Sequence, residues 1–319
     1  MHNTQPWRFT LGPDTVELFA DRSRQLPMID PDGREMLISC GAALFNVVVA
    51  LTTDGYRPSV ERLPETARPD LLARVRADDD NTAHPSDERG LDSPARGLAE
   101  LDRYVIRRQT NRRRFTDDAV PAALIERVRD AARACGATVL PIGHRHDRLM
   151  VAELARTADQ RQILDPAYRA ELRQWTGNQP HRRDGVPALA VPHVAAGTPG
   201  DLPMRDFDTT GSGYLPVDTG TTSDQCLLVL GTVTDTPLAW LHAGEALQHV
   251  LLEIVRHGYV ASPLTQIVED PDTRTRLHDL VHDRLGQDMV PQMLLRVGQA
   301  PPTPAAPRRR IADVLTTSD

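Results

Sequence analysis

The sequence predicts an α+β protein built from two related halves within one chain. Predicted helices and strands alternate along 319 residues, a length that suggests about two domains or one large duplicated domain. The chain also contains an internal repeat, because residues 41–56 (GAALFNVVVALTTDGY) align without gaps with residues 244–259 (GEALQHVLLEIVRHGY). Two copies about 200 residues apart are too distant for a solenoid and indicate two related domains.

Both copies of the repeat are predicted to be buried helices, because apolar residues occupy nearly all of their faces. Gly41 aligns with Gly244, and both copies end in a Gly-Tyr pair, which begins at Gly55 in one and at Gly258 in the other. Glycine suits the left-handed conformation that closes a helix. The alternative is that two buried helices converged on similar residues by chance, but the shared Gly-Tyr ending favours duplication.

The other elements are assigned in chain order. The first half is expected to contain a hairpin at 7–20 around Gly12-Pro13, the first buried helix at 34–54 and a strand at 57–63. The second half is expected to contain helices at 98–107, 121–135 and 148–160, a strand at 226–233, the second buried helix at 240–257 and a strand at 292–297.

Two polar segments separate these elements. Residues 77–97 carry charged residues, Pro and Gly and are typical of a linker or mobile loop. Residues 176–224 are rich in Gly, Pro, Thr and Asp, and we expect them to form an ordered cover or lid. The predicted halves are therefore residues 1–97, which end in the linker, and residues 98–319, which contain the lid.

The composition predicts a soluble cytoplasmic protein. The net charge is −7, so no global field favours nucleic acid, and every basic residue is Arg. Cys40, Cys135 and Cys226 are far apart, without the spacing of a metal site or a disulfide framework, which is typical of a reducing compartment. No apolar stretch approaches the roughly 20 residues that span a bilayer. The N-terminus lacks the layout of a signal peptide.

The densest charge cluster is RRQTNRRRF at residues 107–115. Guanidinium groups with a hydroxyl between them suit a phosphorylated ligand or an electron-rich ring edge. The alternatives are a solvated basic loop and an RNA-contacting patch. A second cluster, Arg308–Arg310, follows the Pro-rich run 301–307 and by itself is typical of a solvated tail. Together the two clusters would bring several cations onto one phosphate.

The N-terminal segment HNTQPWRF (residues 2–9) places two amide side chains, Asn3 and Gln5, around Pro6. Amides pair well with the donor and acceptor edge of a pyrimidine-like ring. Trp7 is expected to be a core residue at the start of a strand. No GxGxxG, Walker loop or GxSxG is present. The histidines show no zinc-binding pattern, so no metal site is predicted.

Three segments together resemble the nitroreductase superfamily, and most closely its actinobacterial Acg-like branch of FMN-binding oxidoreductases. Residues 2–9 resemble the N-x-Q-P-W loop of the family, residues 108–112 (RQTNR) its R-x-S/T-x-R flavin segment, and residues 291–315 its C-terminal strand with an Arg-bearing tail. The segments around Trp175 and Asp184, and the RDF at 205–207, also resemble this branch.

The resemblance implies a nitroreductase-like fold in which two pseudo-symmetric halves form an intramolecular pseudo-dimer. The N-x-Q-P-W loop is present only in the first half and the R-x-T-x-R segment only in the second. We therefore expect one composite site, and one FMN, per chain. Because fused halves already satisfy the interface of an ancestral dimer, we expect a monomer.

The resemblance also implies which residues hold FMN. Arg108 and Arg112 would lie near the ribityl chain and the N1/O2 edge, where a fixed cation stabilises the negative charge that reduction builds. Thr110, Arg308 and Arg309 would hold the phosphate through charge-assisted hydrogen bonds.

The remaining cofactor contacts come from both halves. Asn3 and Gln5 would reach across from the first half, and the backbone around Thr265 and Gln266 would face flavin N5. Family members carry one or two helices before the Asn-containing loop, whereas this sequence starts at Met1. A shortened N-terminus is expected to weaken flavin retention.

The implied function is NAD(P)H-dependent reduction of a flat, electron-poor acceptor, such as a nitroaromatic or a quinone, by bound FMN. The flavin carries the chemistry, so no catalytic side chain is assigned. One alternative is a protein that sequesters FMN under the lid without turnover. Another is an RNA- or anion-binding module built on residues 107–114, which the acidic balance disfavours.

Overall fold

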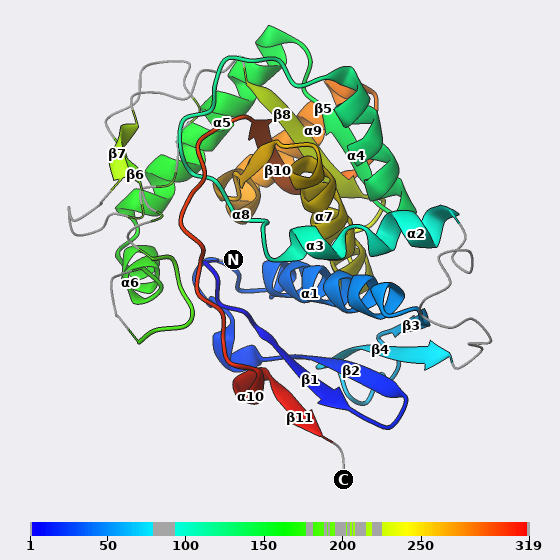
Figure 1. The fold of residues 1–319 in the computed structure, drawn as a ribbon. Coiled ribbons are helices and arrows are strands. Elements are labelled where there is room, and N and C mark those ends of the chain that lie inside the picture. Colours follow the sequence, from blue (N-terminus) through cyan, green and yellow to red (C-terminus); the bar gives the residue numbers. More distant parts are fainter. Residues whose placement is uncertain are drawn as a thin grey trace.

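Two long helices that carry the sequence repeat cross at the centre of the molecule (Figure 1). They are α1 (Arg34–Thr53) and α7 (Pro237–Arg256). The computed structural model describes residues 2–78, 93–176, 181–187, 190, 192–194, 202, 205, 207, 215–218 and 225–317. The bounds of α1 and α7 confirm the buried helices predicted at 34–54 and 240–257.

The aligned glycines of the repeat face each other at this crossing. A Cβ atom on Gly41 would lie 2.3 Å from the carbonyl oxygen of Leu241 and 3.0 Å from Cα of Gly244. A Cβ atom on Gly244 would lie 2.1 Å from the carbonyl oxygen of Ile38. Only glycine allows the two backbones to approach this closely.

Local signals fix the ends of both helices. The Asp30 carboxylate accepts hydrogen bonds from the first-turn amides of α1, at 3.0 Å from Glu35 N and 2.8 Å from Met36 N. Thr236 caps α7, whose first residue is Pro237. Just beyond their C-terminal ends, Gly55 and Gly258 have φ of 91° and 79°, as the Gly-Tyr endings predict.

A five-stranded sheet lies against α1. Its order is β11-β1-β2-β4-β3, and β1 runs parallel to β11, which comes from the far end of the chain. The hairpin predicted at 7–20 and the strand at 57–63 are confirmed, whereas β4 was not predicted. The strand bounds are β1 (Trp7–Leu11), β2 (Thr15–Ala20), β3 (Arg57–Arg62), β4 (Leu71–Asp78) and β11 (Leu315–Thr317).

A four-stranded antiparallel sheet lies against α7, in the order β5-β8-β10-β9. The strands predicted at 226–233 and 292–297 are its two central members. Their side chains are buried along almost their whole length, which suits strands covered on both faces. The bounds are β5 (Thr138–Pro141), β8 (Cys226–Thr232), β9 (Val260–Pro263) and β10 (Val290–Gly298), and a separate parallel pair is β6 (Pro192–Val194) with β7 (Leu215–Asp218).

The other helices surround these layers. The helices predicted at 121–135 and 148–160 are α4 and α5, while the one predicted at 98–107 is divided into α2 and α3. The bounds are η1 (Arg22–Arg24), α2 (Ser93–Ala99), α3 (Asp102–Val105), α4 (Ala122–Ala134), α5 (Arg145–Leu164), α6 (Pro166–Gln174), α8 (Gln266–Glu269), α9 (Pro271–Leu285) and α10 (Ile311–Val314).

The layers bury three main apolar clusters. One joins α1 to the five-stranded sheet through residues such as Leu18, Leu44 and Leu72. A second joins α7 and α4 to the inner face of the four-stranded sheet, and a third joins α5 and α9 to its outer face. The order across the molecule is therefore sheet, α1, α7, sheet and outer helices (Figure 1).

The predicted linker and lid are described only in part. Strand β4 extends to residue 78 and α2 begins at residue 93, so both enter the predicted linker 77–97 from its ends. Residues 79–92 lie outside the described residues, as does most of the predicted lid 176–224. The described pieces of the lid include 181–187, Arg205 and Phe207, which bear on the site below.

Helix α1 corrects the expectation that no apolar stretch approaches the length needed to span a bilayer. An 18-residue stretch of this helix has a mean hydropathy of 1.9, and by length and composition the helix could cross a bilayer. The core helix of a globular domain has the same properties, and just over half of this stretch is buried inside the fold. The apolar character of α1 therefore serves its contacts with α7 and the five-stranded sheet.

Candidate functional site

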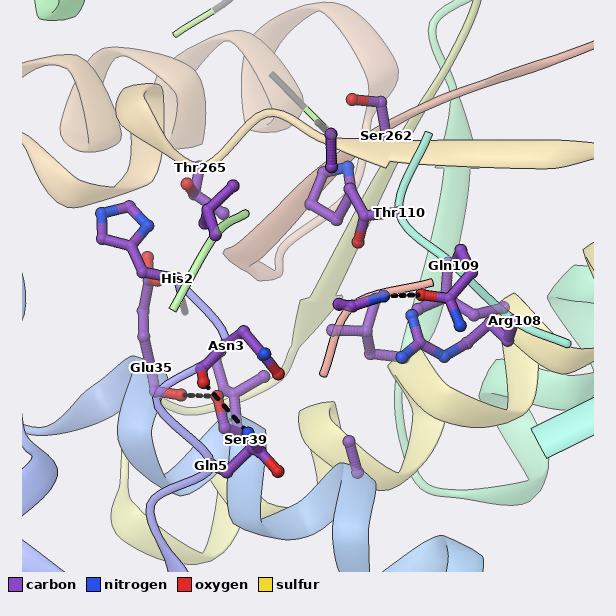
Figure 2. Close-up of a pocket in the computed structure, with 18 of the residues that line it drawn as sticks. His2, Asn3, Gln5, Glu35, Ser39, Arg108, Gln109, Thr110, Ser262 and Thr265 are labelled. Atoms are coloured by element: carbon purple, nitrogen blue, oxygen red, sulfur yellow. Dashed lines mark hydrogen bonds between the residues drawn. The ribbon is translucent and has the colours of Figure 1, made fainter. Parts of the chain in front are cut away.

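A cavity of about 310 Å³ is lined by residues from both the N-terminal and the C-terminal parts of the chain (Figure 2). Its walls come from the N-terminal loop, one face of α1, part of α7, the segment after β9 and the C-terminal tail. Val186, Pro187, Ala190 and Phe207 of the predicted lid also line it. Pockets for small molecules and cofactors typically have volumes of about 300–1,000 Å³.

The cavity brings together eight of the nine residues predicted to bind the cofactor. Figure 2 shows Arg108 on one side and His2, Glu35 and Thr265 on the other. The eight are Asn3, Gln5, Arg108, Thr110, Arg112, Thr265, Gln266 and Arg308.

Arg309 is the predicted residue that the structure places outside the cavity lining. Its guanidinium donates to the backbone oxygens of Gln5, at 3.1 Å, and Trp7, at 3.3 Å. Its backbone N–H donates to Oε1 of Gln5 at 2.8 Å. Arg309 therefore ties the C-terminal tail to the N-terminal loop.

The amide groups of Asn3 and Gln5 hold the walls of the cavity together. Nδ2 of Asn3 donates to the carbonyl oxygens of Gly185 (3.1 Å) and Pro307 (3.0 Å), while its Oδ1 accepts from Nη1 of Arg308 at 3.0 Å. Nε2 of Gln5 donates to the carbonyl oxygens of Arg183 (2.9 Å) and Asn3 (3.4 Å). Because an amide nitrogen has two N–H donors, neither residue has one free to pair with a pyrimidine edge in this arrangement.

The segment that carries Arg108, Thr110 and Arg112 is fixed against β9. Thr110 forms a parallel bridge with Ala261, and the N–H of Asn111 donates to the Ala261 carbonyl at 3.0 Å. The Asn111 side chain donates to Pro301 O at 2.9 Å, which joins the segment to the C-terminal tail. Arg108, Thr110 and Arg112 of the R-x-T-x-R motif thus line the cavity, whereas Arg107 and Arg114 of the same cluster are exposed.

Three arginines supply positive charge to the cavity. Burial, with a smaller contribution from Arg308, lowers the pKa of Arg108 to about 10, and Nε of Arg108 is buried without a hydrogen-bond partner in the described part of the chain. Burial, followed by the charge of Arg205, lowers the pKa of Arg112 to about 10, and its guanidinium lies 4.8 Å from the Phe207 ring centroid. Burial also lowers the pKa of Arg308.

Among the described residues, no carboxylate pairs with Arg108, Arg112 or Arg308. With pKa values of about 10, Arg108 and Arg112 remain charged at neutral pH. Buried charges are normally paired, because removing a charge from water is costly. A cavity lined by three such cations is therefore suited to an anionic or electron-rich ligand.

The opposite side of the cavity contains a buried ion pair that the sequence did not reveal. Nη2 of Arg205 lies 2.6 and 2.5 Å from the two carboxylate oxygens of Glu269, and the two side chains are 7% and 1% exposed. Burial alone would lower the pKa of Arg205, but the Glu269 carboxylate outweighs it and raises that pKa. The pair anchors Arg205, from the predicted lid, to α8.

His2 completes this side of the cavity. Its Nε2 accepts a hydrogen bond from Nη1 of Arg205 at 3.0 Å, since a guanidinium cannot accept. Burial, and then the Arg205 charge, lower the pKa of His2 well below its usual value. The imidazole is therefore neutral, and its ring meets Phe207 edge to face at 5.4 Å.

A second set of contacts holds residues 181–187 over the cavity. The Asp184 carboxylate accepts from Arg24 and from Nε of Arg182, the latter at 2.5 Å. The two guanidinium groups also lie over the Trp175 ring, 5.5 and 4.9 Å from its centroid. The segments around Trp175 and Asp184, which resemble the Acg-like branch, thus contact each other and η1.

Sequence relatives define the family. A Mycobacterium tuberculosis protein named "Putative NAD(P)H nitroreductase Rv3131" is 35% identical over 326 residues, covering 99% of this chain and 87% of that protein. With this identity over nearly its whole length, the chain belongs to the nitroreductase superfamily. The M. tuberculosis protein named "Putative NAD(P)H nitroreductase acg" is 31% identical over 323 residues, covering 98% of this chain and 90% of that protein. The branch is therefore the Acg-like one.

The expected nitroreductase-like α+β fold is confirmed by this membership. No family model matches the chain. Among solved structures, the FMN-dependent nitroreductase NfnB from Mycobacterium smegmatis, in complex with NADPH, aligns with a TM-score of 0.41 and 18% identity, covering 70% of this chain and 100% of that one. A nitroreductase with bound FMN from Bacteroides fragilis aligns with a TM-score of 0.38 and 11% identity, covering 63% and 89%. These scores are too low to relate individual residues.

Proposed function

We propose that this protein binds one FMN in the cavity and uses it to reduce flat, electron-poor acceptors, such as nitroaromatics or quinones, with electrons from NAD(P)H. The observation that carries the proposal is the convergence of Arg108, Arg112 and Arg308, without carboxylate partners among the described residues, on one cavity. The relatives named as NAD(P)H nitroreductases support the same reaction class.

The residues of the cavity fit this cofactor. Nε of Arg108 is a buried donor that has no acceptor among the residues the structure describes, and a phosphorylated ligand with a polyol chain would provide one. In this proposal Thr110 and Arg308 hold the phosphate. Arg108 and Arg112 lie along the ribityl chain and the electron-rich ring edge, where their charge stabilises negative charge that develops there. Bound FMN would supply the hydride-transfer chemistry.

We also propose that residues 1–97 and 98–319 are the two halves of an intramolecular pseudo-dimer. Three observations support this: the repeat-related Gly41 and Gly244 meet at the α1–α7 crossing, β11 of the second half completes the sheet of the first, and the cavity is lined from both halves. An interface satisfied within one chain favours a monomer with one FMN.

A second function, sequestration of FMN without turnover, is supported by the contacts of the lid pieces. Phe207 and residues 185–187 line the cavity. The buried Arg205–Glu269 pair and the Arg24–Asp184 pair fasten them. A cover held this firmly would exclude a nicotinamide from the ring, and the protein would then store the flavin.

Visible absorption of the FMN-reconstituted protein, before and after anaerobic addition of NADPH, tests both functions. Flavin bands that bleach support the reductase, and bands that respond only to dithionite support sequestration. The flavin-to-protein ratio should be one, and Arg308→Met should lower it. Arg310→Met is the matched control, because Arg310 does not line the cavity. A protein that binds no flavin would overturn both functions.

A further inference from the structure

One carboxyl group in the cavity has an oxygen atom without a partner. Glu35 lies in the first turn of α1, its side chain is 2% exposed, and it runs from the helix toward His2 at the cavity wall (Figure 2). Its Oε1 accepts from Nη2 of Arg34 at 2.9 Å. Its Oε2 is buried and has no hydrogen-bond partner within the described chain.

The positive charge of the neighbouring Arg34 is not devoted to Glu35, because its guanidinium also donates hydrogen bonds to other groups. Nη1 of Arg34 donates to the carbonyl oxygen and to Oε1 of Gln292, at 2.8 and 3.2 Å. Its Nη2 also donates to the carbonyl oxygen of Val268 at 3.1 Å. Arg34 therefore joins α1 to α8 and β10 as well as to Glu35.

The other charged and titratable groups around Glu35 do not compensate for its burial. The Glu269 carboxylate on α8 and the Asp30 carboxylate before α1 disfavour a second negative charge, while Arg205 is already paired with Glu269. Tyr168 on α6 is a neutral phenol whose pKa is raised, chiefly by burial.

Burial, and then the charge of Glu269, raise the pKa of Glu35 to about 8. At neutral pH Glu35 is consequently a neutral acid with an O–H to donate. His2, on the same wall, is neutral for the reason given above, and its Nε2 already accepts from Arg205.

We propose that Glu35 is a specificity-determining hydrogen-bond donor of this cavity, which recognises a carbonyl or nitro oxygen on a flat bound ring. A buried donor without an acceptor is costly, and a ligand oxygen at Oε2 would remove that cost. This inference deepens the proposed function and rests on it, since such an oxygen belongs either to the flavin ring or to the electron acceptor that stacks on it.

Two titrations of oxidised protein distinguish these ligands, with no reductant present. In one, FMN is titrated into the apo-protein. In the other, 1,4-naphthoquinone is titrated into the FMN-loaded protein, and both are followed by calorimetry at pH 7 and pH 9. A group with a pKa of about 8 is about nine-tenths protonated at pH 7 and about one-tenth at pH 9, so the affinity for its ligand should fall up to about tenfold.

Substitutions assign the pH effect to Glu35. Glu35→Gln keeps an N–H donor at every pH, so the affinity should become independent of pH. Glu35→Leu removes the donor and should bind several-fold more weakly than wild type at pH 7, without pH dependence. Glu253→Gln is the control, because Glu253 is another buried carboxyl that does not line the cavity. Its Oε2 has no hydrogen bond among the described residues and lies 3.5 Å from Nδ1 of His257. This variant should keep the wild-type pH dependence.

The outcomes test the role of Glu35 and the proposed FMN-binding function separately. A pH effect in the FMN titration assigns Glu35 to the flavin, and one in the quinone titration assigns it to the acceptor. Affinities that differ by less than twofold between pH 7 and pH 9 in both titrations, or a pH effect that survives in Glu35→Gln, overturn the inference. Failure to bind FMN at either pH overturns the proposed function instead. Naphthoquinone is then titrated into the apo-protein, where a pH-independent affinity, or no binding, also overturns the role of Glu35.

Discussion

Replacing Gly244 by alanine tests whether the close crossing of α1 and α7 holds the fold together. The new Cβ would lie 2.1 Å from the Ile38 carbonyl oxygen and 2.8 Å from Cα of Gly41, and both obstacles are backbone atoms. Normal van der Waals contact would require the helices to separate locally by about 1 Å. Interiors are close-packed, so such a shift propagates into the clusters on both sides.

The expected cost follows from two opposing effects. Overpacking typically costs about 1–3 kcal/mol, and we take the upper value because no flexible side chain can move aside. Alanine in place of glycine within a helix contributes about 1 kcal/mol in the other direction. The free energy of unfolding of Gly244→Ala should therefore fall by about 2 kcal/mol. FMN affinity should fall as well, because Glu35 on α1 and Gln248 on α7 both line the cavity.

Urea unfolding followed by circular dichroism measures this change. Gly97→Ala is the matched control, since Gly97 lies in helix α2 and a Cβ atom added there would have no neighbouring heavy atom within 4 Å. That control should be more stable than wild type by about 0.5–1 kcal/mol. If Gly244→Ala unfolds within about 0.5 kcal/mol of wild type, the argument from backbone contact is wrong.

Three further predictions concern charged groups. Arg108→Met should weaken FMN binding by about 10- to 100-fold in calorimetry, because charge-assisted hydrogen bonds are lost, while the melting temperature holds or rises because an unpaired buried cation is removed. Glu269→Gln leaves Arg205 buried without its counter-charge, so the free energy of unfolding should fall by about 3–5 kcal/mol in urea titrations. Partial burial alone would raise the pKa of Asp235, but hydrogen bonds, chiefly from Arg274, lower it to about 2. The stability that Asp235 contributes should therefore be present above about pH 4 and lost between about pH 4 and pH 2, and acid unfolding of Asp235→Asn should lack this component.

The central helices were predictable because their signals are local. An apolar repeat with glycine at its end specifies a buried helix without reference to the rest of the chain. Comparable signals were present for α9, where Asp270 caps the helix, Pro271 begins it and Gly286 ends it with φ of 63°. Strand β4 also alternates apolar and charged residues from Ala73 onward, a pattern typical of a strand with one buried face.

The cofactor residues were predicted through a family motif, whereas the opposite wall of the cavity depends on tertiary structure. Glu35, Arg205 and Glu269 are distant in sequence and meet only because the predicted lid, α1 and α8 converge. One local signal was available, a charged Arg34-Glu35 pair at the start of an otherwise apolar helix. The residue types of Asn3 and Gln5 could not show whether these side chains contact a ligand or the protein backbone. An amide group can hydrogen-bond equally well to either.

The position of the C-terminal tail has a consequence for how the cavity forms during synthesis. Asn3 and Arg308 are hydrogen-bonded although 305 residues separate them, and β11 pairs with β1 at the same edge (Figure 1). At about 5–20 residues per second, a ribosome needs roughly 15–60 s to make the intervening chain. Throughout that time the N-terminal loop lacks its partners in the C-terminal tail. Flavin can therefore be held in the complete cavity only after the whole chain has been synthesised. A chain that stalls before the tail emerges cannot close the cavity wall around a ligand.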